Sequence, residues 1–229
     1  MGERRPGTRG VGERALVVAS DTSSPDDRAA LAELVRSGFG FLDLLFANAG
    51  ITGASEPFTQ VTESRFDEVF AINAKGPYFT VQSLVPLMPA GSSVVLTTSA
   101  ANRMGMPMMS VYSASKAALR SMARTLATDL MPLGIRVNAV SPGPIDTGIL
   151  HRSMPTELAD QLMASMREEN LMKRFGTEDE VVRAVLYLGF EATFNTGAEL
   201  AADGGGLLGR LAAGWFVHGP EICDRPVNF

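Results

Sequence analysis

Short apolar runs alternate with segments of helical periodicity along most of this chain. Residues 42–47, 93–98, 135–140 and 198–202 have the length and composition of buried strands. Between them, apolar side chains recur at helical spacing, and they predict helices over residues 25–36, 64–88, 112–130 and 178–188. Apolar strands that alternate with amphipathic helices predict an α/β fold, with a parallel sheet covered on both faces.

Polar residues and glycines follow the predicted strands at their carboxyl ends. Residues 48–50 (Asn-Ala-Gly) end the first run, Ser99 follows the second, and residues 142–147 (Pro-Gly-Pro-Ile-Asp-Thr) follow the third. Asn73 lies inside the helix predicted over residues 64–88, where an Asn is mildly unfavourable. Open α/β sheets bind ligands at this edge, so we expect a ligand site there.

Tyr112 and Lys116 stand four residues apart in the helix predicted over residues 112–130, and therefore share a helix face. A positive charge about 5 Å from a phenol, at an effective dielectric near 20, is worth roughly 3 kcal/mol, or about two pKa units. The pair thus predicts a Tyr112 with a lowered pKa, suited to general acid–base work, with the Ser99 hydroxyl to hold a carbonyl oxygen. A coincidental pair on a solvated helix face is the alternative.

Five motifs in this order resemble the short-chain dehydrogenase/reductase family over about residues 15–205. They are Asn48-Ala49-Gly50, Asn73-Ala74-Lys75-Gly76, Ser99, Tyr112-x-x-x-Lys116 and Pro142-Gly143. The resemblance implies a Rossmann-like, doubly wound parallel sheet in three layers. It also implies hydride transfer between NAD or NADP and a secondary alcohol or ketone.

The same resemblance implies a role for each matching residue. Tyr112 exchanges the proton, Ser99 orients and polarises the carbonyl, Lys116 lowers the pKa of Tyr112 and holds the nicotinamide ribose, and Asn73 supports a proton relay. The residues implied to contact the cofactor are Asp21, Asn48, Ala49, Gly50, Tyr112, Lys116, Pro142, Gly143, Ile145 and Thr147.

Each of these residues also has a purely structural interpretation. Asn48 could bridge sheet backbone, Asn73 could be satisfied by helix carbonyls, and Ser99 could be a turn residue. Asp146 with Thr147 could cap a helix, and Asp21 could be the N-cap of the helix that begins near Pro25.

The amino-terminal part departs from the family pattern. Residues 15–19 form the first strand-like run, and Asp21-Thr22-Ser23-Ser24-Pro25 follows it in place of a glycine-rich turn. Residues 7–12 (Gly-Thr-Arg-Gly-Val-Gly) follow no strand and precede no helix, so we do not interpret them as a phosphate loop. We therefore expect the first two strand–helix units to be missing. Residues 15–19 are then expected to pair with the inner edge of the strand at 42–47.

These patterns divide the chain into a flexible leader at 1–14, a single domain at 15–206 and a tail at 207–229. The net charge of −5 argues against nucleic acid or an anionic membrane as partner, and the single cysteine against a disulfide or a cysteine metal site. No segment has the length of a membrane span. We expect a cytoplasmic protein that binds no metal. Small residues in the helix at 112–130 predict a homodimer or homotetramer through this helix and the one containing Asn73.

Two functions remain open at this point. The first is an NAD(P)-dependent oxidoreductase acting on an apolar carbonyl compound, with the Met-rich residues 148–171 closing over the substrate. The second is a non-catalytic, truncated member of the family that binds the dinucleotide poorly and acts through oligomerisation.

Overall fold

Four parallel strands form the centre of the protein. The computed structural model describes residues 15–208 except 54 and 154. Within these residues the strands follow one another across the sheet in the order β1-β2-β3-β4. The register sets Leu44 opposite Ser93 and Val94 opposite Val137. The strands are β1 Leu44–Ala47, β2 Ser93–Thr97, β3 Arg136–Pro142 and β4 Glu199–Ala202, close to the predicted ranges.

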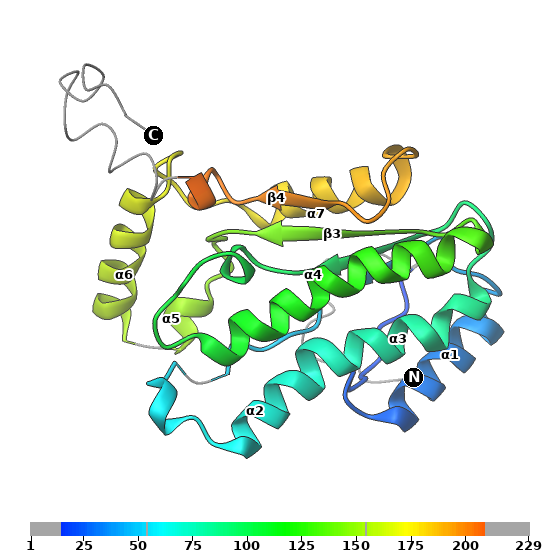
Figure 1. Cartoon of the computed structure of the whole chain (residues 1–229), viewed down its shortest axis with the longest axis horizontal. Helices are drawn as coiled ribbons and strands as arrows, with labels where there is room; N and C mark the ends of the chain where they lie inside the picture. Colours follow the sequence, from blue (N-terminus) through cyan, green and yellow to red (C-terminus); the bar gives the residue numbers. More distant parts are fainter. Residues whose placement is uncertain (1–14, 54, 154, 209–229) are drawn as a thin grey trace, which may run out of the picture.

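Helices cover both faces of this sheet, so the predicted α/β fold is confirmed (Figure 1). Val94 and Leu96 point to one face and pack with side chains of α3 and α4, including Val81 and Leu119. Val95 points to the other face and packs with α7. The helices are α1 Pro25–Gly38, α2 Glu63–Phe70, α3 Gly76–Leu84, α4 Ser110–Leu130, α5 Ile149–Ser153, α6 Thr156–Glu169 and α7 Glu178–Leu186.

Local sequence explains where several helices begin. The Ser24 hydroxyl accepts from the Asp27 amide at the start of α1, and Pro25 occupies the first turn. Thr177 and Glu180 form a reciprocal capping box at the start of α7. None of the helices in the described part of the chain is long and apolar enough to cross a membrane.

The helix predicted over residues 64–88 is interrupted. A π-helical turn, Ala71–Lys75, separates α2 from α3, and a 3₁₀ turn, Val85–Leu87, follows α3. Asn73 lies in the π-helical turn and is fully buried. A π-turn inserts one residue into the helical ladder and is often found at functional sites.

The expectation that residues 15–19 form the inner strand beside β1 is wrong. They form no strand, and Leu16 and Val17 are more than half exposed, at 57% and 56%. The chain that follows them is held in the helical layer, because Thr22 bonds to Arg28 and Thr80. Among the described residues, β1 is therefore paired on its β2 side alone. The predicted leader and nearly all of the predicted tail lie outside the described residues.

Candidate active site

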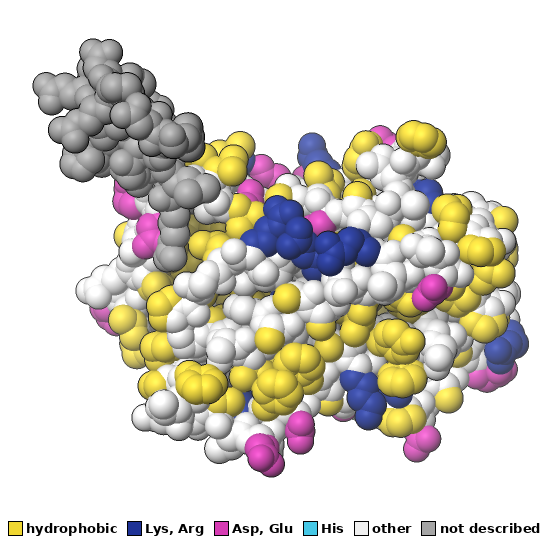
Figure 2. Space-filling view, in the orientation of Figure 1, with side chains coloured by type: hydrophobic (Ala, Val, Ile, Leu, Met, Phe, Trp, Pro, Cys, Tyr) yellow, Lys and Arg dark blue, Asp and Glu magenta, His cyan; other side chains and the backbone are white. Residues whose placement is uncertain are grey.

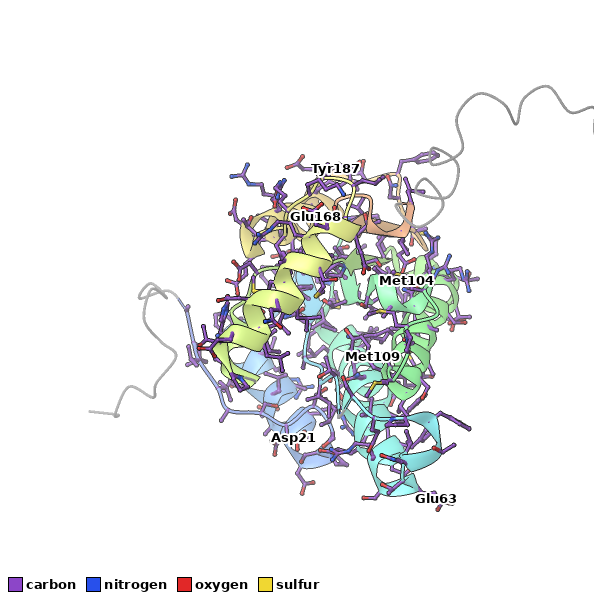
Figure 3. The ribbon with its side chains drawn as sticks, turned by 90° about the vertical axis from the view of Figure 1, so that its left-hand side faces the viewer. Asp21, Glu63, Met104, Met109, Glu168 and Tyr187 are labelled. Atoms are coloured by element: carbon purple, nitrogen blue, oxygen red, sulfur yellow. The ribbon has the colours of Figure 1, made fainter. Side chains whose placement is uncertain are left out.

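The carboxyl ends of the strands meet at one end of the sheet, where α5 and α6 also lie (Figure 1). Figure 3 looks onto this end, with Met104 and Met109 on the loop before α4 and Glu168 on α6. Ser99, Tyr112, Lys116 and Asn73 come together here from β2, α4 and the π-helical turn.

Ser99 lies two residues past β2 and begins a 3₁₀ turn, Ala100–Asn102. Its hydroxyl oxygen accepts from the Ala101 amide at 3.2 Å, so Ser99 is a turn residue, as one interpretation predicted. The hydroxyl also lies near the Tyr112 phenol, where it acts to lower the pKa of Tyr112. Because the Ala101 bond uses an oxygen lone pair, the proton of Ser99 is free to be donated toward the phenolic oxygen.

Tyr112 lies in the first turn of α4 and is half-buried. Burial raises the pKa of the Tyr112 phenol, and the hydrogen bond from Ser99 offsets part of that rise. The expectation that Lys116 brings this pKa down toward neutrality is therefore wrong for the free protein. Desolvation of the phenolate outweighs the stabilisation supplied by its neighbours.

Lys116 lies one helical turn after Tyr112, as predicted, and is almost fully buried. Its ammonium nitrogen Nζ donates to the carbonyl oxygen of Thr97 at 2.8 Å and stands 5.8 Å from the centroid of the Tyr112 ring. Burial lowers the pKa of Lys116 to about 8, because the charged form loses hydration. The amine is thus easily deprotonated for a lysine.

Asn73 is fully satisfied, but not by helix carbonyls. Its Oδ1 accepts from the Ile51 amide and its Nδ2 donates to the Ile51 carbonyl, both at 2.8 Å. Nδ2 also donates to the Ser115 hydroxyl at 3.0 Å. The side chain therefore ties the segment after β1 to the helix that carries Tyr112 and Lys116.

Gly50 lies against this group. A Cβ atom at Gly50 would stand 3.2 Å from both Asn73 Oδ1 and Lys116 Nζ. A larger residue there would crowd both groups, so the close packing of the segment after β1 on Asn73 and Lys116 favours glycine. Asn48 and Ala49 are exposed, and Asn48 Oδ1 accepts from the Thr97 hydroxyl at 2.9 Å instead of bridging sheet backbone.

The turn after β3 is tightly packed on the turn after β4. A Cβ atom at Gly143 would stand 2.6 Å from Asp203 Cα, so only glycine fits. Ile145 forms an isolated parallel bridge with Gly176. The Asp146 carboxylate accepts from the Gly148 amide at 3.4 Å, a turn bond that lies before α5 and caps none of the amides inside that helix. Pro142 and Thr147 flank this half-buried turn.

Comparison with known proteins identifies the family. Residues 5–206 match the family model described as enoyl-(acyl carrier protein) reductase. The chain belongs to the short-chain dehydrogenase/reductase family. It is 37% identical to the oxidoreductase asL5 of Sarocladium schorii, covering 86% of this chain and 79% of the relative. It is 34% identical to the 2-(R)-hydroxypropyl-CoM dehydrogenase of Xanthobacter autotrophicus, covering 84% and 78%.

A solved structure supports the fold of this short-chain dehydrogenase/reductase. A short-chain dehydrogenase/reductase of Brucella melitensis, described as a glucose/ribitol dehydrogenase, has a TM-score of 0.75 at 29% identity. The match covers 86% of this chain and 77% of that one.

Asp21 lies at the surface, before α1 of this family member. Its carboxylate accepts from the amide and the hydroxyl of Ser23, and these bonds lower the pKa of Asp21. The N-cap of α1 is Ser24, so the capping interpretation of Asp21 is wrong. The bonds that its carboxylate makes stay within the turn at residues 21–23.

Sequence reasoning missed a buried carboxylate behind Ser99. Glu199, in β4, accepts from Thr98 and Asn102 and pairs with Arg120. A signal was available in the sequence. Glu199 is a charged residue inside residues 198–202, an apolar run predicted to be a buried strand, and a buried charge requires a partner.

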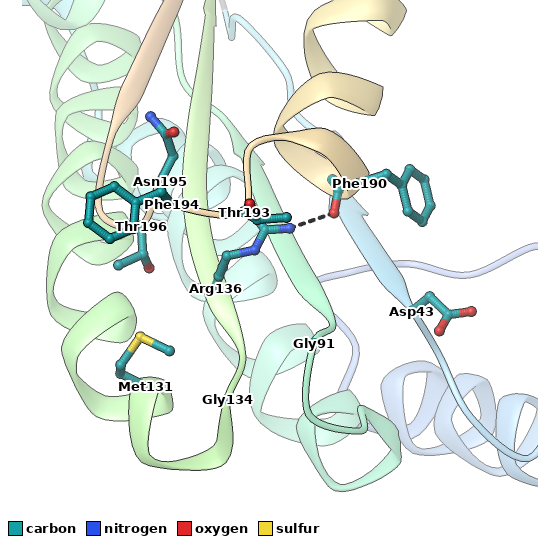
Figure 4. A pocket seen from close by; sticks show the side chains of 11 residues that line it. Asp43, Gly91, Met131, Gly134, Arg136, Phe190, Thr193, Phe194, Asn195 and Thr196 are labelled. Carbon is teal, nitrogen blue, oxygen red and sulfur yellow. Dashed lines mark hydrogen bonds between the residues drawn. The ribbon is translucent and has the colours of Figure 1, made fainter.

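A separate hollow of about 710 Å³ lies at the opposite end of the sheet (Figure 4). Arg136 lines it, and its guanidinium donates to the carbonyl oxygens of Leu188, Gly189 and Ala192. These bonds satisfy carbonyls at the carboxyl end of the α7 helical segment, so Arg136 has a structural explanation. Within the described part of the chain, no cluster of three or more His, Cys, Asp or Glu side chains could hold a metal ion.

Proposed function

We propose that this chain is an NAD(P)-dependent oxidoreductase that interconverts a secondary alcohol and a ketone. The observation that supports it is the contact of the Ser99 and Tyr112 hydroxyls beside Lys116 and Asn73, at the carboxyl edge of the sheet. A relative from Sinomonas cyclohexanicum, 34% identical, is named a cis-4-hydroxycyclohexanecarboxylate dehydrogenase, and its name also describes oxidation of a ring hydroxyl.

The residues around Lys116 fit the nicotinamide end of the cofactor. Gly50 is exposed and lies directly against Lys116 Nζ and Asn73 Oδ1, so its bare backbone would let a ribose come near the lysine, and residues 142–147 border the same edge. The fit is poorer at the pyrophosphate end. The described residues contain no glycine-rich turn between a strand and a helix, and α1 carries Asp26 and Asp27 in its first turn. Two carboxylates there disfavour a second anion.

A bound nicotinamide supplies or accepts the hydride, and the residues of this chain handle the proton. In the reductive direction, the Ser99 hydroxyl holds the substrate carbonyl oxygen and Tyr112 donates its phenolic proton to that oxygen. In the oxidative direction, the Tyr112 oxygen takes the proton from the alcohol. The reductive step leaves Tyr112 as a phenolate and the oxidative step begins from it; the Lys116 ammonium stabilises this phenolate, and Asn73 fixes the chain beside it.

The second candidate is a non-catalytic family member with impaired dinucleotide binding. The non-catalytic candidate is favoured by the edge of β1 that no described residue pairs with, because the first two strand–helix units expected in the family would lie on that side. Each charge-assisted hydrogen bond missing from a phosphate cradle costs about 1.5–3 kcal/mol. Loss of several such bonds would weaken binding by orders of magnitude.

Cofactor titration separates the two candidates. Nicotinamide fluorescence is followed as NADH and NADPH are added to the full chain, and turnover is then measured with cyclic and steroidal ketones. The oxidoreductase proposal predicts saturable binding and turnover, with turnover reduced about 10²–10⁴-fold in Tyr112→Phe and binding retained. Absence of binding at millimolar cofactor favours the non-catalytic candidate.

We also propose a homodimer or homotetramer that assembles through α4 and the Asn73 helix, in the cytoplasm. Ala114 and Ala117 are exposed on α4 and would allow close helix contact. A monomer by light scattering at micromolar concentration contradicts this assembly. The residues 148–171 are proposed to close over an apolar substrate, although Met163 itself is buried in the protein.

A further inference from the structure

A buried carboxylate stands behind the Ser99 turn and has no role in the mechanism above. Glu199 begins β4, and only 9% of its side chain is exposed. A carboxylate buried to this degree is costly unless hydrogen bonds and opposite charges compensate it. The partners of Glu199 therefore indicate what its burial achieves.

One carboxylate oxygen holds the chain on both sides of Ser99. Glu199 Oε1 accepts from the Thr98 hydroxyl at 2.7 Å and from Asn102 Nδ2 at 2.6 Å. Thr98 directly precedes Ser99. The backbone N–H of Asn102 donates to the backbone carbonyl oxygen of Ser99 at 2.9 Å and closes the turn. Ser99 thus lies between two residues that are fixed to a single atom.

The other carboxylate oxygen faces two arginines. Glu199 Oε2 is 3.0 Å from Arg120 Nε and 3.5 Å from Arg103 Nε. Arg120 lies one turn after Lys116 on α4. Figure 2 shows Lys and Arg side chains gathered along this part of the molecular surface. Glu199 therefore connects the Ser99 turn to the helix that carries Tyr112 and Lys116.

We propose that Glu199 is a positioning residue that sets the Ser99 hydroxyl against the Tyr112 oxygen. The inference deepens the proposed function and rests on it, because it requires Tyr112 to be the proton carrier. Glu199 acts through Thr98, Asn102 and Arg120, the residues that its carboxylate contacts, and not through a bond of its own to the Ser99 or Tyr112 hydroxyl.

If Glu199 positions Ser99, removing its carboxylate should raise the pKa of Tyr112. If Glu199 acts only through its negative charge, removing it should lower that pKa. A nearby negative charge disfavours the phenolate, so its loss alone would lower the pKa of Tyr112. Loss of a well-placed Ser99 hydrogen bond removes stabilisation of the phenolate and raises the pKa of Tyr112. The direction of the shift therefore distinguishes the two roles.

The first experiment titrates Tyr112 without requiring turnover. The chain has three tyrosines, so Tyr78→Phe and Tyr187→Phe leave Tyr112 as the one phenol seen by ultraviolet absorbance. In this background Glu199→Ala is compared with Ser99→Ala as reference and Glu33→Ala as control. Glu33 forms an exposed ion pair with Arg36 on α1.

The expected result is an upward shift of the Tyr112 pKa in Glu199→Ala, in the direction that Ser99→Ala gives, and no shift in Glu33→Ala. An unchanged or lowered pKa in Glu199→Ala overturns the inference, and so does an unchanged pKa in Ser99→Ala. If Glu199→Ala does not fold, Thr98→Val removes the hydroxyl next to Ser99 with little change of shape. It should give a smaller shift of the same sign, and no shift overturns the inference.

The second experiment uses the kinetic constants of the active enzyme. Misplacing a reacting group by about 1 Å can cost on the order of 10²-fold in rate, so Glu199→Ala should lose about that much kcat with KM little changed. Glu199→Gln keeps an oxygen acceptor for Thr98 and Asn102 and should recover most of the kcat. Wild-type kcat in Glu199→Ala overturns the inference. A wild-type chain without any turnover contradicts the proposed function, while the Tyr112 titration still decides the role of Glu199.

Discussion

At the carboxyl edge of the sheet, the half around Tyr112 and the half on the β1 side differ in how firmly their side chains are held. Around Tyr112, each candidate residue is buried or half-buried and bonded to a separate element, as Asn73 is to Ile51 and Ser115. On the β1 side, Asn48, Ala49 and Asp21 are exposed, and the carboxylate of Asp21 bonds within its own turn. The proton-transfer half is thus preorganised by the fold, whereas the half expected to hold adenosine is not.

The sheet shows the same contrast. The four residues of β1 are all half-buried, while Val94, Val95, Val137 and Val140 in β2 and β3 have no exposed surface. A strand paired on one side and half-covered contributes less to stability than a central strand. Substitutions on the two sides should therefore have different consequences.

The largest expected difference is in turnover. Ser99→Ala removes the hydroxyl that contacts Tyr112 and should lower kcat by about 10²–10³-fold, since it deletes a donor aimed at the developing charge. Asp21→Asn, on the exposed half, should leave kcat unchanged. Steady-state kinetics with saturating cofactor measures both, and equal losses would erase the distinction between the halves.

Lys116 should make the stability of the protein depend on pH. Its pKa is about 8 in the folded protein, against 10.5 for the free side chain. Between these values the unfolded chain binds the proton and the folded chain does not, so stability rises with pH across this window. The gain is about 3 kcal/mol between pH 8 and pH 10.5, and below pH 8 the full cost of burying the charge is present.

Urea unfolding at pH 7.5, 9 and 10.5 measures that pH dependence, with Lys116→Met as the matched variant. The wild-type chain should become more stable over this range relative to the variant. Parallel curves for the two proteins would show that the amine is hydrated in the folded state.

Asn73 and Asn48, one from each half, should differ in how much they contribute to the free energy of unfolding. Asn73→Ala leaves the Ile51 amide and carbonyl without these partners in a buried setting, and should cost about 3 kcal/mol of unfolding free energy. Asn48→Ala removes one exposed hydrogen bond from Thr97 and should cost less than about 1 kcal/mol. Chemical denaturation at pH 7 gives both values, and an Asn48 cost as large as that of Asn73 would contradict the ranking.

The smallest effect expected is in hydrogen exchange. The amides of β1 should exchange at least about tenfold faster than those of β2, because in the described part of the chain β1 is paired on one side alone. Within residues 15–208, the amides of Val17 and Val18 form no backbone hydrogen bond, so they should exchange fastest. Protection of these two amides would instead indicate that residues 15–19 pair with a strand.

The sequence predicted the strands and the grouping of Ser99, Tyr112 and Lys116, because these depend on local period and on which strand end a residue follows. It did not predict that residues 15–19 stay outside the sheet. Their apolar pattern is strand-like, and only the tertiary contacts of Thr22 with Arg28 and Thr80 direct the chain elsewhere.

The direction of the Tyr112 pKa could not be predicted for a related reason. Spacing gives the distance to Lys116, whereas burial of the phenol depends on loops and helices that are far away in sequence. The same holds for Glu199, whose partners Thr98 and Asn102 are about a hundred residues earlier in the chain. Pairings at such separation leave no periodic signal.

The paired bonds between Asn73 and Ile51 have a consequence for engineering the protein. They join the two ends of the segment formed by residues 52–72, which consists of a loop with the exposed Phe58 followed by helix α2. Doubling the length of a flexible loop costs only about 0.6 kcal/mol in closure entropy. A segment inserted in the loop near the exposed Phe58 should therefore cost little in closure entropy and leave the residues that carry the proton in place.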